Sequence, residues 1–416
     1  MNDEFNDFPF FPDEERDLPE LAQRALQQGE LDQALELGET WLESHPLDVD
    51  AMHLCALAAA GLGDELKALT LYRKALLLEP AHGPLHHNLG ALLEKRKDYL
   101  QALSHLRRAM VLQPDFPEIY INLGNVLDAL GQSEEALAMY REAIRRQPET
   151  GDVFFNQGCA LNRLGRYREA LESFDAVLLQ DPGSASALNG KGLALIGLGY
   201  DEEAIAAFSA AIERTPDSTL YRYNRALALR GQQRLLEALQ ELDEILNVDA
   251  NYIDAVLQKA EVLHQLGLEQ EGWAALKKAE ELDPEHPEIP CCRGLLLKSQ
   301  GDLTGALQAV EQCLGHFPDD RKALGQKGLI LMELGRLDEA ALCFNAVLEQ
   351  GENADIAYRM ACIYARQGQV RKAAKSLDQA AARDPEKLRA AQTDTAFDTV
   401  RETPSFKRLF KKFHLL

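Results

Sequence analysis

Apolar residues follow a helical spacing twice within a unit of 34 residues that recurs along most of the chain. In each unit they fall mainly at positions 4, 8 and 11 and again at positions 20, 24 and 27, with polar residues frequent between them. Spacings of three, four and seven place such residues on one side of an α-helix. The pattern therefore predicts that every unit is a pair of amphipathic helices.

Prolines set the register of this repeat. They take position 32 of the unit at Pro46, Pro80, Pro114, Pro148, Pro182, Pro216, Pro284 and Pro318. Ala250 interrupts the series, and the last interval is one residue short, ending at Pro385. The eleven units then begin at Glu15, Val49, Gly83, Pro117, Gly151, Ala185, Thr219, Ile253, Pro287, Arg321 and Ala354.

Small residues recur where the two helices of a unit must cross. Positions 8 and 20 are Gly or Ala in all eleven units, and position 24 is often Tyr or Phe. Position 15 is glycine in nine units, which predicts a left-handed residue that ends the first helix. The proline at position 32 ends the second helix, because its ring cannot continue an interior turn.

The small residues at positions 8 and 20, the large residue at 24, the frequent alanine at 27 and the proline at 32 resemble the tetratricopeptide repeat family over residues 15–387. The resemblance implies an all-α fold, an α-solenoid in which eleven helical hairpins stack into a right-handed superhelix. It also implies that the first helices line the concave side. We expect a protein that binds other proteins and is not an enzyme.

The two ends of the chain depart from the repeat. Residues 388–416 hold apolar residues without its register, and we expect a capping helix, since a bare last hairpin would expose an apolar patch. A membrane-surface or partner helix is the alternative, because Lys407, Arg408, Lys411 and Lys412 lie among the aromatics. The segment resembles those that close bacterial arrays, which favours a bacterial source. Residues 1–14 alternate acids with four phenylalanines and are expected to be disordered, as a frayed end or as a ligand motif.

Composition excludes several functions. A formal net charge of -23 disfavours nucleic-acid binding. No apolar run is long enough to span a bilayer and no signal peptide is evident, so a cytoplasmic protein is expected. The seven cysteines contain no CxxC pair and are expected to be reduced thiols. His82, His86 and His87 crowd one junction, but the loop residues there disfavour a metal site, and no cofactor motif is present.

The candidate ligand site is a ladder of carboxamides at position 6. It consists of Asn88, Asn122, Asn156, Asn224, Gln258 and Gln326. A carboxamide can pair with both the N–H and the C=O of an extended peptide. Similar ladders line the superhelix of O-linked N-acetylglucosamine transferases, although the family consensus itself favours asparagine here.

Position 5 should lie beside the ladder and offers Ile121, Phe155 and Tyr223 as apolar anchors. Asn125 with Lys95 or Arg163 is a poor match to the carboxylate clamp of some family members. We therefore expect a scaffold or adaptor that holds an extended peptide segment of another protein along repeats three to seven. The alternatives are a self-assembling homo-oligomer that uses residues 1–14, and a regulatory subunit of a separately encoded enzyme.

Overall fold

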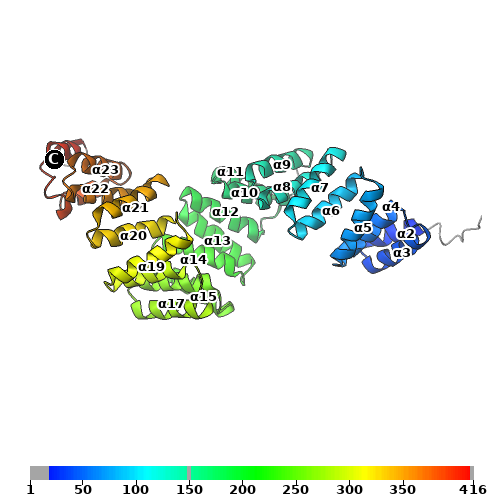
Figure 1. Cartoon of the computed structure of the whole chain (residues 1–416), viewed down its shortest axis with the longest axis horizontal. Coiled ribbons are helices and arrows are strands. Elements are labelled where there is room, and N and C mark those ends of the chain that lie inside the picture. The colour runs from blue at the N-terminus through cyan, green and yellow to red at the C-terminus, as the bar shows by residue number, and fades with distance from the viewer. Residues whose placement is uncertain (1–17, 148–150, 413–416) are drawn as a thin grey trace, which may run out of the picture. The chain divides into compact units, whose positions relative to one another are not determined.

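The computed structural model describes residues 18–147 and 151–412, and all regular structure in these ranges is helical (Figure 1). This confirms the predicted all-α fold. The chain forms two compact units, Met1–Pro216 and Asp217–Leu416. The Phe-rich segment 1–14 and Phe413 of the closing segment lie outside the described residues, so the predictions made for them are not addressed by the structure.

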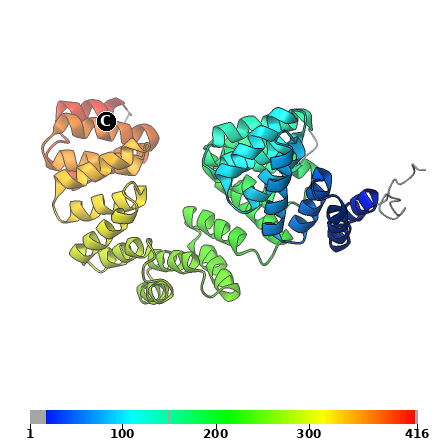
Figure 2. The same ribbon diagram turned by 45° about the vertical axis from the view of Figure 1, so that its right-hand side comes forward.

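The first unit contains the hairpins of repeats one to six. Their first helices are α2 (Leu18–Gln28), α4 (Val49–Gly61), α6 (Gly83–Lys95), α8 (Pro117–Ala129), α10 (Gly151–Arg163) and α12 (Ala185–Leu198). Their second helices are α3 (Leu31–Ser44), α5 (Glu65–Leu78), α7 (Tyr99–Leu112), α9 (Ser133–Arg146), α11 (Tyr167–Gln180) and α13 (Asp201–Arg214). From α3 to α11, each second helix also contacts the first helix of the next hairpin, so the hairpins stack (Figure 2).

The second unit contains repeats seven to eleven. Their first helices are α14 (Thr219–Gly231), α16 (Ile253–Gln265), α18 (Ile289–Ser299), α20 (Arg321–Glu333) and α22 (Ala354–Arg366). Their second helices are α15 (Leu235–Val248), α17 (Glu269–Leu282), α19 (Leu303–His316), α21 (Leu337–Glu349) and α23 (Val370–Arg383).

The register read from the prolines matches the helix boundaries closely. From the second repeat to the eleventh, every first helix but one begins at the first residue of its predicted unit. The exception is α18, which begins at Ile289 and carries Pro290 in its first turn, where a proline is tolerated. The short interval before Pro385 has a local cause, because α21 has 13 residues where the other second helices have 14.

Aromatic rings of the second helices fill the space left by glycines of the first. A Cβ atom placed on Gly124 would overlap the Tyr140 ring, and one on Gly328 would overlap the Phe344 ring. Both rings are almost completely buried. The small residues at position 8 are therefore a packing requirement of each hairpin.

The turn between the two helices takes a left-handed residue even where glycine is missing. Glycines at position 15 have φ values such as 78° at Gly29 and 77° at Gly131. The same position is Lys97 in repeat three, with φ 62°, and Gln233 in repeat seven, with φ 58°. The fold imposes this conformation on residues that disfavour it.

Exchanging these turn residues should change stability in opposite directions. Lys97→Gly is expected to stabilise the chain by about 0.5–1 kcal/mol, because it relieves the left-handed strain but adds entropy to the unfolded chain. Gly131→Lys is expected to destabilise by about 1 kcal/mol, since nothing lies within 4 Å of its Cβ position and only backbone strain changes. Urea denaturation of both variants measures the effect, and two shifts of the same sign would contradict it.

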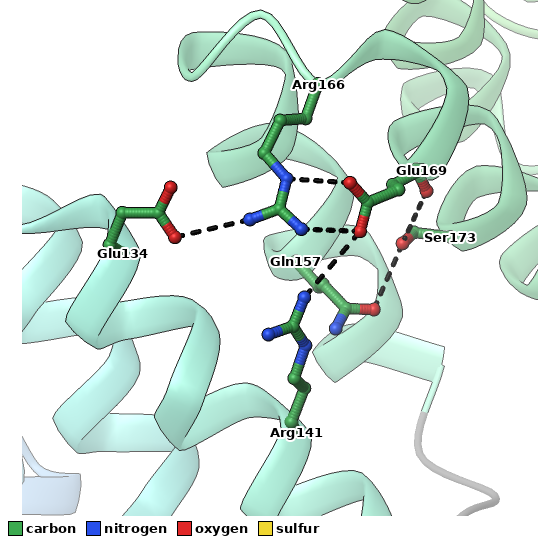
Figure 3. Close-up of polar contacts among 6 residues, drawn as sticks. All are labelled: Glu134, Arg141, Gln157, Arg166, Glu169 and Ser173. Carbon is green, nitrogen blue, oxygen red and sulfur yellow. Dashed lines mark hydrogen bonds and ion pairs between the residues drawn. The ribbon is translucent and has the colours of Figure 1, made fainter.

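Polar contacts tie the second helices of repeats four and five together (Figure 3). Arg166, just before α11, donates to both carboxylate oxygens of Glu169 at 2.7 and 2.6 Å, and to Glu134 of α9 at 3.2 Å. Ser173 of α11 donates to Gln157 of α10 at 3.0 Å. The hydrogen bonds from Arg166 hold the pKa of the Glu169 carboxyl below its usual value. These exposed charges are satisfied within the protein.

The closing segment, expected to form a capping helix, contains two short helices and a turn. It consists of α24 (Pro385–Ala390), the 3₁₀ turn η1 (Thr395–Phe397) and α25 (Pro404–Lys412). The chain bends at Asp394, whose side chain caps η1 and accepts a hydrogen bond from the Tyr358 hydroxyl at 2.7 Å. The polar groups at this bend are thus bonded to the last hairpin.

Apolar side chains of the closing segment are buried against α22 and α23. They are Leu388, Ala391, Ala396, Phe397, Val400, Phe406, Leu409 and Phe410. Lys412 pairs with Asp378 of α23 at 2.7 Å. Because Phe406, Leu409 and Phe410 of α25 face the last hairpin, they are not exposed toward a membrane surface in this structure.

Candidate functional site

The position 6 asparagines of the first unit connect neighbouring first helices. The Asn88 amide donates from Nδ2 to Nε2 of His53 at 2.7 Å, and Asn122 donates in the same way to His87 at 3.0 Å. All four side chains are half-buried. Each amide also has a second N–H and an oxygen that these hydrogen bonds do not use. The ladder therefore joins repeats and retains groups that could meet a ligand.

Burial keeps the histidine partners neutral. Burial, with a further contribution from His82, lowers the pKa of His53 from 6.5 to about 4, and burial lowers the pKa of His87. A neutral imidazole can accept a hydrogen bond at Nε2, whereas a protonated one donates from both nitrogens. The hydrogen bonds from Asn88 and Asn122 thus require the unprotonated state.

Stability should fall as the pH is lowered from 6.5 to 4. The unfolded chain binds a proton at position 53 more tightly than the folded chain, so the stabilisation is present above pH 6.5 and is lost toward pH 4. The loss attributable to His53 is about 2–3 kcal/mol. His53→Gln, whose carbonyl can still accept from Asn88, should flatten this dependence in urea titrations. Identical pH dependence in the two proteins would refute the assignment.

A hollow of about 340 Å³ in the first unit gathers three of the candidate residues, Asn125, Asn156 and Arg163. Asn125 Oδ1 accepts hydrogen bonds from the Tyr140 hydroxyl at 3.0 Å and from Asn156 at 2.9 Å. Arg163 forms an ion pair with Asp128. Because an acidic neighbour already neutralises Arg163, the arrangement is not an open clamp for a carboxylate.

The position 5 side chains of the first unit are partly buried in the core and partly exposed to solvent. Ile121 and Phe155 are half-buried and pack against the core of repeats four and five. The Phe155 ring meets that of Phe174 edge to face, with centroids 6.0 Å apart. Asn224, in the second unit, is half-buried on α14. These residues leave part of their surface accessible to a ligand.

A pocket of about 380 Å³ in the second unit brings together Tyr223, Gln258 and Gln326, which come from three different hairpins. Its lining also includes charged residues that the repeat pattern did not single out as ligand contacts. They are Arg230, Glu261, Glu288, Asp320 and Lys322. Leu227, Leu257 and Phe317 supply apolar wall.

Glu261 is the centre of the polar network in this pocket. It is 7% exposed and accepts from Arg230 at 2.6 Å and from Lys322 at 2.5 Å. Arg230 also donates to the Gln258 carbonyl oxygen. Gln326 Oε1 is buried and has no hydrogen-bond partner among the described residues. A buried acceptor without a partner costs free energy. A ligand that brings a hydrogen-bond donor would satisfy it.

Cys291, which lines the same pocket, is joined to Cys313 of α19 by a disulfide. This corrects the expectation that all seven cysteines are reduced. The two residues occupy facing positions of one hairpin, and the small residues at its crossing bring their Cα atoms to 5.3 Å. Cys55, Cys159, Cys292, Cys343 and Cys362 are free.

Within residues 18–147 and 151–412 no cluster of three metal-ligating side chains occurs. At the histidine junction, the Nδ1 atom of His86 lies 2.9 Å from that of His105 on α7. His86 is therefore paired with His105 and not with His82. In the same ranges, no helix combines the length and the apolar character needed to cross a membrane.

Family models described as tetratricopeptide repeat match most of the chain. One matches residues 20–84, 155–219, 202–254 and 358–391, a second matches 83–149 and a third matches 297–361. No curated protein sequence matches the chain.

Solved structures show the same fold. A chain of the APC/C hetero-tetramer Cut9–Hcn1 is 13% identical, with a TM-score of 0.51 over 96% of both chains. A tetratricopeptide repeat protein from Parabacteroides merdae is 19% identical, with a TM-score of 0.50 over 60% of this chain and 98% of its own. At these identities the likeness concerns the fold alone.

Proposed function

Because the chain belongs to the tetratricopeptide repeat family, whose fold is a scaffold for protein–protein interaction, we propose that it binds extended segments of partner proteins along the first helices of its hairpins. The observation that carries the proposal is the pocket of the second unit, where Tyr223, Gln258 and Gln326 converge from three hairpins. A surface that collects side chains from several neighbouring repeats suits a ligand that runs across the repeats.

The chemistry of the face also supports an extended ligand. Half-buried carboxamides recur one repeat apart at Asn88, Asn122 and Asn156, and each can present an N–H and a carbonyl to peptide main chain. Between them, Ile121, Phe155 and Tyr223 offer apolar or aromatic surface for ligand side chains. Their spacing along the stack would fix the register of the bound segment.

The test is binding of immobilised 15-residue peptide pools to the full chain. We expect binding that falls at least tenfold when Asn88, Asn122, Asn156 and Asn224 are changed together to alanine, since several main-chain hydrogen bonds are lost. Asn247 and Asn345 lie exposed on second helices, so their double alanine variant is the matched control. Undiminished binding by the four-residue variant, with its fold verified by circular dichroism, would exclude the ladder as the contact surface.

Because Asn88 and Asn122 also hold neighbouring repeats together, a second variant separates binding from stability. Gln326→Leu removes an acceptor that has no partner in the free protein, so the fold loses no hydrogen bond. Weaker peptide binding by this variant would come from the binding surface and not from partial unfolding.

A further inference from the structure

The pocket of the second unit has a chemistry more specific than general peptide binding. Its walls come from the first helices α14, α16, α18 and α20 and from the residues just before α18 and α20. Three carboxylates, two cations and two carboxamides surround one hollow of about 380 Å³. Which of these groups already have partners decides what kind of ligand the pocket accepts.

The two cations of the lining are already paired. Arg230 of repeat seven donates to Glu261 at 2.6 Å, and Lys322 of repeat ten lies 2.5 Å from both oxygens of the same carboxylate. An incoming anion would have to compete with Glu261, which is 7% exposed and fixed by these contacts. The pocket is therefore not prepared for a ligand carboxylate.

The acceptors in the same pocket are not all paired. Gln326 Oε1 is buried without a donor among the described residues. The Glu288 carboxylate lines the pocket, and no side-chain donor reaches it in the described ranges. Burial, followed by repulsion from Asp254, raises the pKa of Glu288, and the opposing attraction of His286 and Lys322 does not cancel this rise. Both groups therefore lack a hydrogen-bond donor.

An arginine side chain supplies what these groups lack. Its guanidinium carries a permanent charge and five N–H donors in a plane, so it can serve a carboxylate and a carbonyl oxygen at once. Its methylene stem and flat head can lie against Tyr223, Leu227 and Phe317 of the pocket wall. A lysine would bring the charge but not the planar set of donors.

We propose that this pocket binds an arginine side chain of the partner segment, with the Glu288 carboxylate and Gln326 Oε1 accepting hydrogen bonds from its guanidinium. Because the arginine belongs to the bound segment, the inference rests on the proposed function. It adds the chemical identity of one contact.

The first experiment uses a small probe and so does not depend on binding of an extended segment. N-acetyl-arginine-N-methylamide is titrated into the full chain and followed by NMR or calorimetry, with the citrulline analogue as the neutral control of nearly the same shape. We expect the arginine probe to bind at least tenfold more tightly, because citrulline lacks the charge that Glu288 attracts. Equal affinity for the two probes would overturn the proposal.

Three variants assign the contact. Glu288→Gln and Gln326→Leu should each weaken binding of the arginine probe about tenfold. Gln326→Leu should at the same time leave thermal stability unchanged or raise it, since it removes a buried acceptor without a partner. Glu244 lies exposed on α15, so Glu244→Gln is the matched control for loss of one acid and should bind as the wild type does. Full affinity in both pocket variants would also overturn the proposal.

The second experiment separates this inference from the proposed function. Peptide pools that carry a fixed central arginine, citrulline or alanine are compared on the wild type and on Glu288→Gln. Preference for the arginine pool that disappears in Glu288→Gln supports the arginine contact. Pools that bind equally refute the arginine contact and leave the scaffold function standing, whereas absence of binding by every pool contradicts the scaffold function while the probe titration still decides the pocket.

Discussion

Leucine in place of Gly328 is expected to destabilise the second unit by about 3 kcal/mol, whereas leucine in place of Gly325, one turn earlier in α20, should stabilise it by about 0.5–1 kcal/mol. At Gly328 even a Cβ atom would overlap the Phe344 ring, which is completely buried. At Gly325 nothing lies within 4 Å of the Cβ position. Both changes improve helix propensity equally. The difference between the unfolding free energies of the two variants therefore measures the steric cost at the helix crossing.

Urea denaturation of the two full-length variants provides the measurement. Because each variant carries one glycine-to-leucine substitution in the same helix, the two have the same composition and charge. If Gly328→Leu were as stable as Gly325→Leu, the two helices of the hairpin would be able to separate at little cost, and small residues at position 8 would not set their crossing.

Removing the Phe397 ring should lower the free energy of unfolding by about 3–5 kcal/mol. Phe397 is completely buried between the last hairpin and α25, with its ring centroid 5.7 Å from those of both Tyr358 and Phe406. The large cavity left by Phe397→Ala cannot collapse easily, because two helices and the 3₁₀ turn surround it. Lys411→Ala, on the exposed side of α25, should stay within about 0.5 kcal/mol of the wild type.

Hydrogen exchange shows which helices are destabilised by this substitution. In Phe397→Ala, the amides of α22 and α23 should lose protection before those of repeats seven to nine, because only the last hairpin loses its cover. Unchanged protection in α22 and α23 would mean that the closing segment does not stabilise the array.

The fold could be predicted from the sequence because its determinants lie within one period. Proline at position 32, glycine at position 15 and small residues at positions 8 and 20 each act inside a single hairpin, so one register located nearly every first-helix start. Asp394 lies beyond the last period, and its contact with Tyr358 bends a segment that no longer follows the repeat.

The candidate site was predictable only in part. Periodicity located the carboxamides, and the pairing of Asn88 with His53 could have been found from a histidine at position 5 that precedes an asparagine at position 6 in the next repeat. The pocket of the second unit has no such signal, because Arg230, Glu261 and Lys322 occupy different positions of repeats seven, eight and ten. Their encounter depends on the stacking of hairpins, as does the disulfide between Cys291 and Cys313, whose separation of 22 residues matches no motif.

The contact between Lys322 and Glu261 bears on how the second unit unfolds. In a linear repeat array each hairpin is stabilised by its immediate neighbours, and the free energies of folding add along the chain. Here a residue of repeat ten bonds directly to one of repeat eight, 61 positions earlier. Repeats eight and ten are therefore thermodynamically coupled beyond what repeat nine transmits, so a model with nearest-neighbour terms alone should underestimate the cooperativity of this unit.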